Sequence, residues 1–165
     1  MAGIKTPKFM QDINIFENGI GHLGTSESFE LPKIAWNRES MEKGGFEIDV
    51  KTGIFSKMET KLVIEEYSSN VIAAMADDEN SYFVVKGSVY SEGKATPAVA
   101  TIKGDFDLDL GSWKAKEKLS QSLEIKVKYF ELEMNGEQQI LIDTKNMIAK
   151  INGKDMLAEL RANIA

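Results

Sequence analysis

Alternating apolar and polar residues dominate the chain and predict a protein built mainly of β-strands. Four segments carry the pattern and are bounded by turn residues: KLVIEEY, YFVVKGSVY, PAVATIKGDFDLDL and QSLEIKVKYFELEMN. The Asn-Gly pairs at Asn18-Gly19 and Asn135-Gly136 are typical of tight hairpin turns between antiparallel strands.

One of these segments changes its alternation partway along. The apolar residues from Leu123 to Tyr129 occupy odd positions, whereas those from Phe130 to Met134 occupy even positions. A shift of one residue moves side chains to the opposite face of a strand. The pattern therefore predicts either a β-bulge near Tyr129 or a strand whose two ends are buried on opposite faces.

Helical patterns are few and short. SSNVIAAMADDE offers a Ser or Asn cap before a short apolar turn, which predicts a helix from Asn70 to Ala76. KDMLAELRA predicts a second helix, because Asp155 near its start and Arg161 near its end suit the helix dipole.

The segment from Leu31 to Leu62 predicts a long hairpin that reverses at Gly44-Gly45. Its arms of about eleven residues would extend about 36 Å at about 3.3 Å per residue. A globule of this length has a radius of gyration of about 15 Å, so the arms would project beyond the body. Such a ribbon is marginal alone in water, and we expect a neighbouring subunit to cover it. The candidate assembly residues are Trp36, Gly44, Gly45, Phe46 and Phe55.

The composition narrows the functional classes. With 165 residues, of which 42% are hydrophobic, the chain is expected to form one domain over residues 1–165. The absence of cysteine excludes disulfides, thiolate zinc sites and cysteine nucleophiles. The apolar runs are short, so we expect no transmembrane span and no secretory signal. A net charge of −6 makes the protein a poor nucleic-acid binder but a surface past which nucleic acid could slide.

Gly19, Gly21 and Gly24 have the spacing of a dinucleotide-binding loop. That motif needs a helix directly after the last glycine, because the helix N-terminus holds the pyrophosphate. The residues TSESFELPK that follow Gly24 show no helical period before Pro32. A β-hairpin at Asn18-Gly19 is the better interpretation, and we expect no bound cofactor.

Three aspartates, Asp105, Asp107 and Asp109, alternate in DFDLDLG. The spacing resembles the start of a calcium loop, but Leu110 and Lys116 occupy the positions where an EF-hand has Gly and Glu. The aspartates instead share one face of a strand. That face is either solvated or lines a surface with a specific role.

The remaining candidates for chemistry are isolated residues. His22 is the only histidine and is expected at the surface or in a hairpin. Glu65 and Glu66 are expected on opposite faces of a strand, so they do not form a carboxylate pair. Trp113, in SWKAKEK, is expected to anchor its loop onto the body or onto a neighbour. No combination of nucleophile, base and oxyanion donor is found, and we predict neither an enzyme nor a metal site.

The chain, most densely in its C-terminal third, resembles the major tail tube protein of contractile phage tails and the tube protein of R-type pyocins. The resemblance rests on the order and spacing of several features from the start of the chain to its end. They are NIFENG, LPK at Leu31 to Lys33, Gly44-Gly45, Trp113 with Lys114 and Lys118, Tyr129-Phe130, Asn135-Gly136, Ile142-Asp143, Asn146, INGKD from Ile151 to Asp155, Leu157, Arg161 and Asn163. The chain departs from the family pattern at its end, RANIA, where relatives finish with Gly-Leu.

The resemblance implies a β-sandwich or barrel-like body with a flanking helix, assembled in sixfold rings that stack into a hollow tube within a contractile sheath. The implied partners are further copies of the chain, the sheath, the tape measure protein inside the tube, and the baseplate and tail terminator proteins. Genomic DNA would pass through a phage tube without sequence-specific binding, whereas a pyocin-like tube would open the cell envelope. The tube would form in the host bacterial cytoplasm and belong to the virion, and Asp105, Asp107 and Asp109 would face an acidic lumen.

An alternative from another class is a small lipocalin-like β-barrel that holds an apolar ligand. It would be a stable monomer that binds a fluorescent apolar probe, whereas a tube protein would form rings or tubes as its concentration rises.

Overall fold

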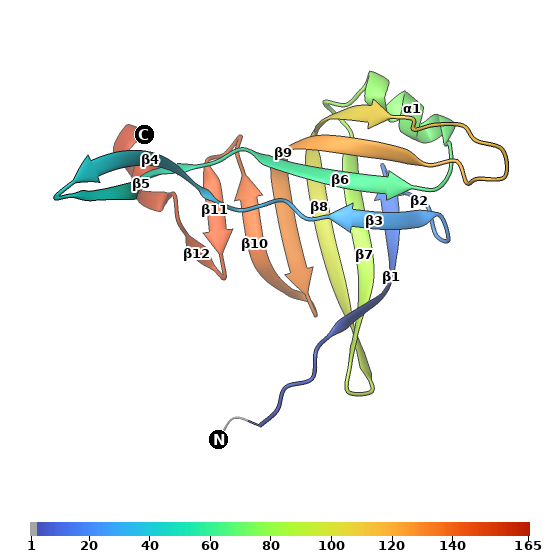
Figure 1. The fold of residues 1–165 in the computed structure, drawn as a ribbon, viewed down its shortest axis with the longest axis horizontal. Coiled ribbons are helices and arrows are strands. Elements are labelled where there is room, and N and C mark those ends of the chain that lie inside the picture. The colour runs from blue at the N-terminus through green and yellow to red at the C-terminus, as the bar shows by residue number, and fades with distance from the viewer. Residues whose placement is uncertain (1–2) are drawn as a thin grey trace.

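The computed structural model describes residues 3–165, which form twelve strands and two short helices (Figure 1). The first strands are β1 (Phe9–Glu17), β2 (Ile20–Gly21), β3 (Ser26–Glu30), β4 (Trp36–Lys43), β5 (Phe46–Phe55) and β6 (Met58–Ile64). After helix α1 (Ser69–Ala76) come β7 (Tyr82–Ser91), β8 (Lys94–Asp109), β9 (Gln121–Met134), β10 (Glu137–Asp143), β11 (Ile148–Ile151), β12 (Lys154–Asp155) and helix α2 (Ala158–Ile164). The prediction of a mainly β protein with short helices is confirmed.

Two layers share the long strands β8 and β9. The order of the large layer is β12-β11-β10-β9-β8-β7-β1-β2, and its neighbouring strands are antiparallel. The first half of β9 pairs instead with β6, which also pairs with β3. Figure 1 shows β3 and β6 running crosswise over β7 and β8. The body is therefore a sandwich whose second layer, called the crossing layer, consists of β3, β6 and the adjoining ends of β8 and β9.

The predicted bulge in β9 is confirmed, and it is the corner between the two layers. Lys103 pairs with Tyr129 but the next residue, Gly104, pairs with Val127, so Lys128 is the extra residue. A Cβ on Gly104 would clash with the carbonyl oxygen of Lys126, which explains why glycine stands here. The bulge keeps the apolar residues of both halves of β9 pointing into the core, despite their change of parity.

The core lies between the layers and is filled by side chains. Phe83 of the large layer meets Phe106 of the crossing layer edge to face, with ring centroids 5.4 Å apart. Leu62, Ile125 and Phe130 are almost completely buried beside them. The large layer ends at β12 and β2, which do not pair with each other, so the described residues do not form the closed barrel of the lipocalin-like alternative.

Both predicted helices are present, but the second begins at Ala158 rather than near Asp155, because Lys154–Asp155 forms strand β12. The Ser68 hydroxyl accepts a hydrogen bond from the Asn70 amide at 3.3 Å, and α1 buries Val71 and Ala74 in the core. Helix α2 buries no side chain, but an Asp155 oxygen accepts from the Arg161 guanidinium at 2.7 Å. This hydrogen bond lowers the pKa of Asp155. Neither helix of the described chain is long and apolar enough to cross a membrane.

The long hairpin is confirmed, but its predicted bounds of Leu31 to Leu62 are wrong. Strands β4 and β5 form a separate two-stranded sheet from Trp36 to Phe55, defined here as the ribbon. Met58–Ile64 is instead β6 of the body, because its alternate residues are buried between the layers. Figure 1 shows the ribbon projecting sideways beyond β10, β11 and β12.

The glycine-rich segment at residues 18–24 forms the expected hairpin. Phe16 pairs with Gly21 across a turn in which Asn18 and Gly19 both have positive φ angles, of 47° and 85°. The chain then enters strand β3 at Ser26 rather than the helix that a dinucleotide loop requires.

Candidate assembly surfaces

The ribbon is amphipathic, and none of the described residues covers its apolar face. Met41 pairs with Ile48, Glu39 with Val50 and Lys43 with Phe46, so this face carries four apolar side chains beside Glu39 and Lys43. The opposite face is polar and carries Arg38, Ser40, Glu42, Glu47, Asp49 and Lys51. Phe46 is 73% exposed, and Met41, Ile48 and Val50 are exposed as well. Water would contact this apolar face in an isolated subunit.

An aromatic stack fixes the ribbon to the body. The rings of Trp36 and Phe55 lie 4.1 Å apart and are nearly parallel, and the Lys51 ammonium lies 4.6 Å from the centre of the Trp36 ring. Phe55 also packs against the core. Two of the predicted arm residues, Trp36 and Phe55, thus hold the base of the ribbon rather than its exposed face.

The ribbon also carries a bulge next to this stack. Arg38 pairs with Lys51 and Trp36 with Phe55, so β5 advances by four residues where β4 advances by two. Gly53 has a φ angle of +83°, and the Thr52 hydroxyl donates a hydrogen bond to the Asn37 carbonyl at 3.0 Å. The bulge bends the ribbon where it leaves the body.

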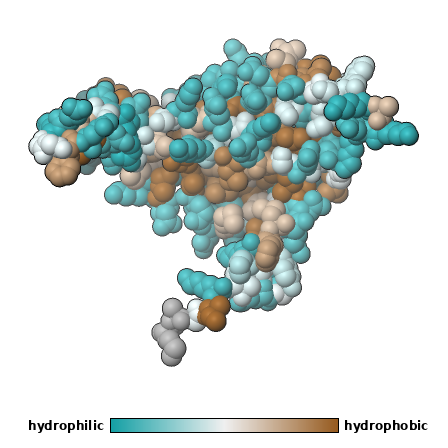
Figure 2. Space-filling view, in the orientation of Figure 1, coloured by the Kyte–Doolittle hydropathy of each residue, from teal (hydrophilic) through white to brown (hydrophobic). Residues whose placement is uncertain are grey.

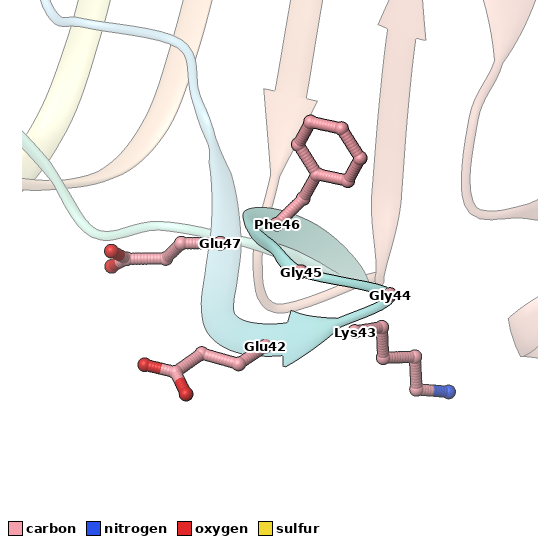
Figure 3. Close-up of a pocket in the computed structure, with 6 residues that line it drawn as sticks. All are labelled: Glu42, Lys43, Gly44, Gly45, Phe46 and Glu47. Carbon is pink, nitrogen blue, oxygen red and sulfur yellow. The ribbon is translucent and has the colours of Figure 1, made fainter.

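The tip of the ribbon contains the other three predicted arm residues. Gly44 and Gly45 have φ angles of +58° and +81°, which a tight reversal requires. Figure 3 shows Phe46 pointing away from Glu42 and Lys43. These residues line an open hollow of about 410 Å³. The tip thus presents one aromatic side chain beside charged ones.

A second apolar surface lies between the base of the ribbon and helix α2. A hollow of about 270 Å³ is lined there by Ile54, Met58, Met147, Leu157 and Leu160. Leu160 and Ile164 of α2 are also exposed. Figure 2 shows a hydrophobic band across the middle of the visible face of the body, bordered by hydrophilic residues. The apolar surface of the subunit is therefore more extensive than the ribbon alone.

Asp105, Asp107 and Asp109 share the outer face of the crossing layer, as their alternation predicts. The register places Glu30, Glu59 and Glu124 on this face as well. The basic residues of its strands are Lys61, Lys126 and Lys128, of which Lys126 pairs with Glu59 and Lys128 with Asp105, each at 3.1 Å. A hydrogen bond from Lys128 lowers the pKa of Asp105. We call this surface, with six acidic and three basic residues, the acidic face.

Trp113 lies on the loop that joins β8 to β9 and is 78% exposed. Its indole Nε1 donates to the Tyr67 hydroxyl at 3.0 Å, and that hydroxyl donates to the Leu110 carbonyl. Lys118 on the same loop lies 3.3 Å from Glu65. The body holds the loop through these polar contacts and leaves most of the indole ring free for a neighbour.

Of the two places predicted for His22, the hairpin is confirmed and the surface is not, because His22 directly follows β2 and its backbone amide donates to the Ile15 carbonyl of β1 at 2.9 Å. His22 is only 4% exposed, and its Nδ1 lies 2.7 Å from a Glu66 oxygen. Glu65 and Glu66 lie just beyond the end of β6 rather than within a strand. Glu17 is buried nearby, and burial raises its pKa despite the attraction of His22 and a hydrogen bond from Asn18.

This buried polar cluster was missed, although one signal in the sequence points to it. Glu17 continues the alternation of Ile13 and Ile15, both of which face the core. Within residues 3–165 the structure contains no group of three or more His, Cys, Asp or Glu side chains placed to hold a metal ion.

The fold defines a two-layered β-sandwich with a projecting amphipathic ribbon, an architecture suited to a structural subunit that packs against others. The chain belongs to the phage tail tube protein FII family, whose model matches residues 7–164. It is therefore a non-enzymatic, structural component of phage tails.

Individual relatives match along almost their full length. The tail tube protein of Escherichia phage P2 is 26% identical over 167 residues, which cover 96% of this chain and 97% of that protein. The major tail tube protein of Serratia phage KSP20 is 23% identical and covers 91% of each chain. A chain of the cryo-EM structure of the anti-feeding prophage (AFP) baseplate, 6-fold symmetrised, superposes with a TM-score of 0.44 at 10% identity, over 81% of this chain and 96% of that chain.

Proposed function

We propose that the chain is the subunit of hexameric rings that stack into the inner tube of a contractile tail or tail-like particle. The observation that carries the proposal is the ribbon, whose apolar face has no partner within the described residues. A two-stranded sheet needs a further layer for independent stability. In a tube, neighbouring subunits supply that layer.

The tube is the conduit for DNA in a phage, or for envelope puncture in a particle without a genome. Further copies of the chain are its first partners. The sheath lies outside the tube, the tape measure protein lies inside it, and the baseplate and tail terminator proteins close its ends. Assembly takes place in the host bacterial cytoplasm before the tube becomes part of the virion.

The acidic face, which includes Asp105, Asp107 and Asp109, lines the lumen in this proposal. DNA that moves along a surface of its own charge sign is repelled rather than bound, so it can pass without adhering. The composition of this face supports the proposal, since it carries six acidic but only three basic residues. A density map of the assembled tube tests the orientation, and an acidic face turned outward toward the sheath would refute it.

Electron microscopy of the purified protein at increasing concentration tests the proposed function. We expect hexameric rings and stacked tubes with a continuous central channel. A protein that stays monomeric at millimolar concentration, or that forms filaments without a channel, would contradict the proposal.

A further inference from the structure

Charge is segregated along the ribbon. Its outer part, from Glu39 to Asp49, contains four acidic residues and one lysine, a net charge of −3 (1 − 4). The chain on either side of the base, residues 33–38 and 50–57, contains only basic charges, on Lys33, Arg38, Lys51 and Lys57. The ribbon therefore has an acidic tip and a basic base.

Two adjoining hollows lie at that base, and we define them together as the base groove. Their volumes are about 560 and 490 Å³, and both are lined by Ile34, Ala35 and Trp36. Phe55, Ile140, Ile151 and Met156 complete an apolar floor. An engineered apolar cavity of about 150 Å³ already accepts benzene, so the groove has room for an aromatic side chain.

The charged residues that line the base groove are all basic. They are Lys33, Arg38, Lys57 and Lys154, and no acidic side chain lines either hollow. Lys57 lies 3.9 Å from Glu59, whereas Lys33, Arg38 and Lys154 form no ion pair with any residue that the structure describes. The groove therefore combines an apolar floor with uncompensated positive charge, in a chain whose net charge is −6.

We propose that the ribbon tip of one copy docks in the base groove of the next copy. Phe46 enters the apolar floor, and Glu42 and Glu47 face Lys33 and Lys154 at the rim. The two surfaces are complementary in both hydrophobicity and charge, the combination that fixes orientation and partner in protein interfaces. This inference rests on the proposed function, because it identifies the surface that receives the ribbon.

The contact must join different copies. The eight residues of β4 span about 26 Å at about 3.3 Å per residue, which separates the tip from the groove of its own chain. Because the tip and the groove are different surfaces, a row of docked copies always has a free tip at one end and a free groove at the other. Such a heterologous contact continues from copy to copy, and closes into a ring or extends into a filament according to its rotation.

Disulfide trapping tests the contact directly, because the natural chain has no cysteine. One preparation carries Lys43→Cys, which leaves Phe46 in place at the tip, and a second, of different size through a tag, carries Met156→Cys. Both positions are exposed, so neither change is expected to disturb folding. On mild oxidation of the mixture we expect the mixed disulfide to form more than about tenfold faster than in the control, since docking raises the effective concentration of the two thiols.

The matched control replaces the tip cysteine with Ala95→Cys, an exposed position beside the turn between β7 and β8. Equal rates for the two mixtures would overturn the proposal. The rate advantage should also fall in about 1 M salt, where the Debye length is about 3 Å.

Charge reversal gives a second, independent test. The pair Glu42→Lys/Glu47→Lys and the pair Lys33→Glu/Lys154→Glu should each slow polymerisation, and a chain that carries all four changes should recover it. If the chain with all four changes polymerises as slowly as the two double variants, the assignment of the tip to the groove is contradicted.

The two proposals fail in distinguishable ways. Tubes seen by microscopy without preferential trapping would mean that the ribbon docks elsewhere, so the inference fails while the tube function stands. Trapping between copies that never form tubes would support the contact and refute the tube function.

Discussion

The strands of the body and of the ribbon share the same alternation of apolar and polar residues, but in the isolated subunit their apolar side chains differ in burial. In β6 and β9 the alternate apolar residues are buried because a second layer of the same chain covers them. In the ribbon, the equivalent alternation of Phe46, Ile48 and Val50 stays exposed because no second layer follows. Alternation thus specifies a face that must be covered, but not which chain covers it.

The largest expected effect comes from truncating one phenylalanine in each region. Phe130→Ala should destabilise the subunit by about 3–5 kcal/mol, because Phe130 is completely enclosed in the core. Phe46→Ala should change monomer stability by less than about 0.5 kcal/mol and yet impair polymerisation, since Phe46 contacts other copies in our account. Urea denaturation of the monomer and light scattering at high concentration measure the two effects. Equal destabilisation by both variants would abolish the distinction between the regions.

The corner of the body offers the next test. Gly104→Ala should cost about 1–3 kcal/mol, because the added Cβ meets the backbone of β9 rather than a flexible side chain. Asp107→Ala, on the outer face of the same strand, should cost less than about 0.5 kcal/mol. Denaturation midpoints report both, and an unchanged midpoint for Gly104→Ala would show that the bulge adjusts freely.

The corner also illustrates what local sequence predicts well. The parity change after Tyr129 is visible because strand alternation has a period of two, and Asn-Gly turns have a specific backbone preference. A bulge and two hairpins could be predicted from these signals alone.

Features that depend on distant segments could not be predicted in the same way. Met58–Ile64 alternates as a ribbon strand would, and only its pairing with β9 assigns it to the body. The side chain of His22 contacts Glu66, which lies 44 residues away in the sequence. The base groove likewise combines the residues before β4 with residues of β10, β11 and β12. Local patterns do not encode such neighbours.

A smaller effect concerns the buried polar cluster of the body. Burial raises the pKa of Glu17, so the stability that its neutral form contributes is present below the unfolded pKa near 4.5 and is lost as pH rises through the folded pKa. Glu17→Gln should therefore gain stability relative to the natural chain as pH rises from 4 to 7.

The exposed Glu59 provides a control of opposite sign. A hydrogen bond from Lys126 lowers the pKa of Glu59, so the stability it contributes is present above the unfolded pKa and is lost as pH falls through the folded pKa. Glu59→Gln should lose stability relative to the natural chain as pH rises. The measurement is the free energy of unfolding of each variant and of the natural chain between pH 4 and 7. The account is contradicted if the stabilities of Glu17→Gln and Glu59→Gln, relative to the natural chain, change in the same direction.

The most direct test of the account removes the ribbon and leaves the body intact. Residues 37–54 are replaced by a short Gly/Ser linker that joins Trp36 to Phe55, whose rings already lie 4.1 Å apart. We predict a monomer that unfolds cooperatively, but that neither forms tubes in electron micrographs nor extends preformed ones. A shortened chain that polymerises as well as its parent would show that the ribbon is not the assembly element.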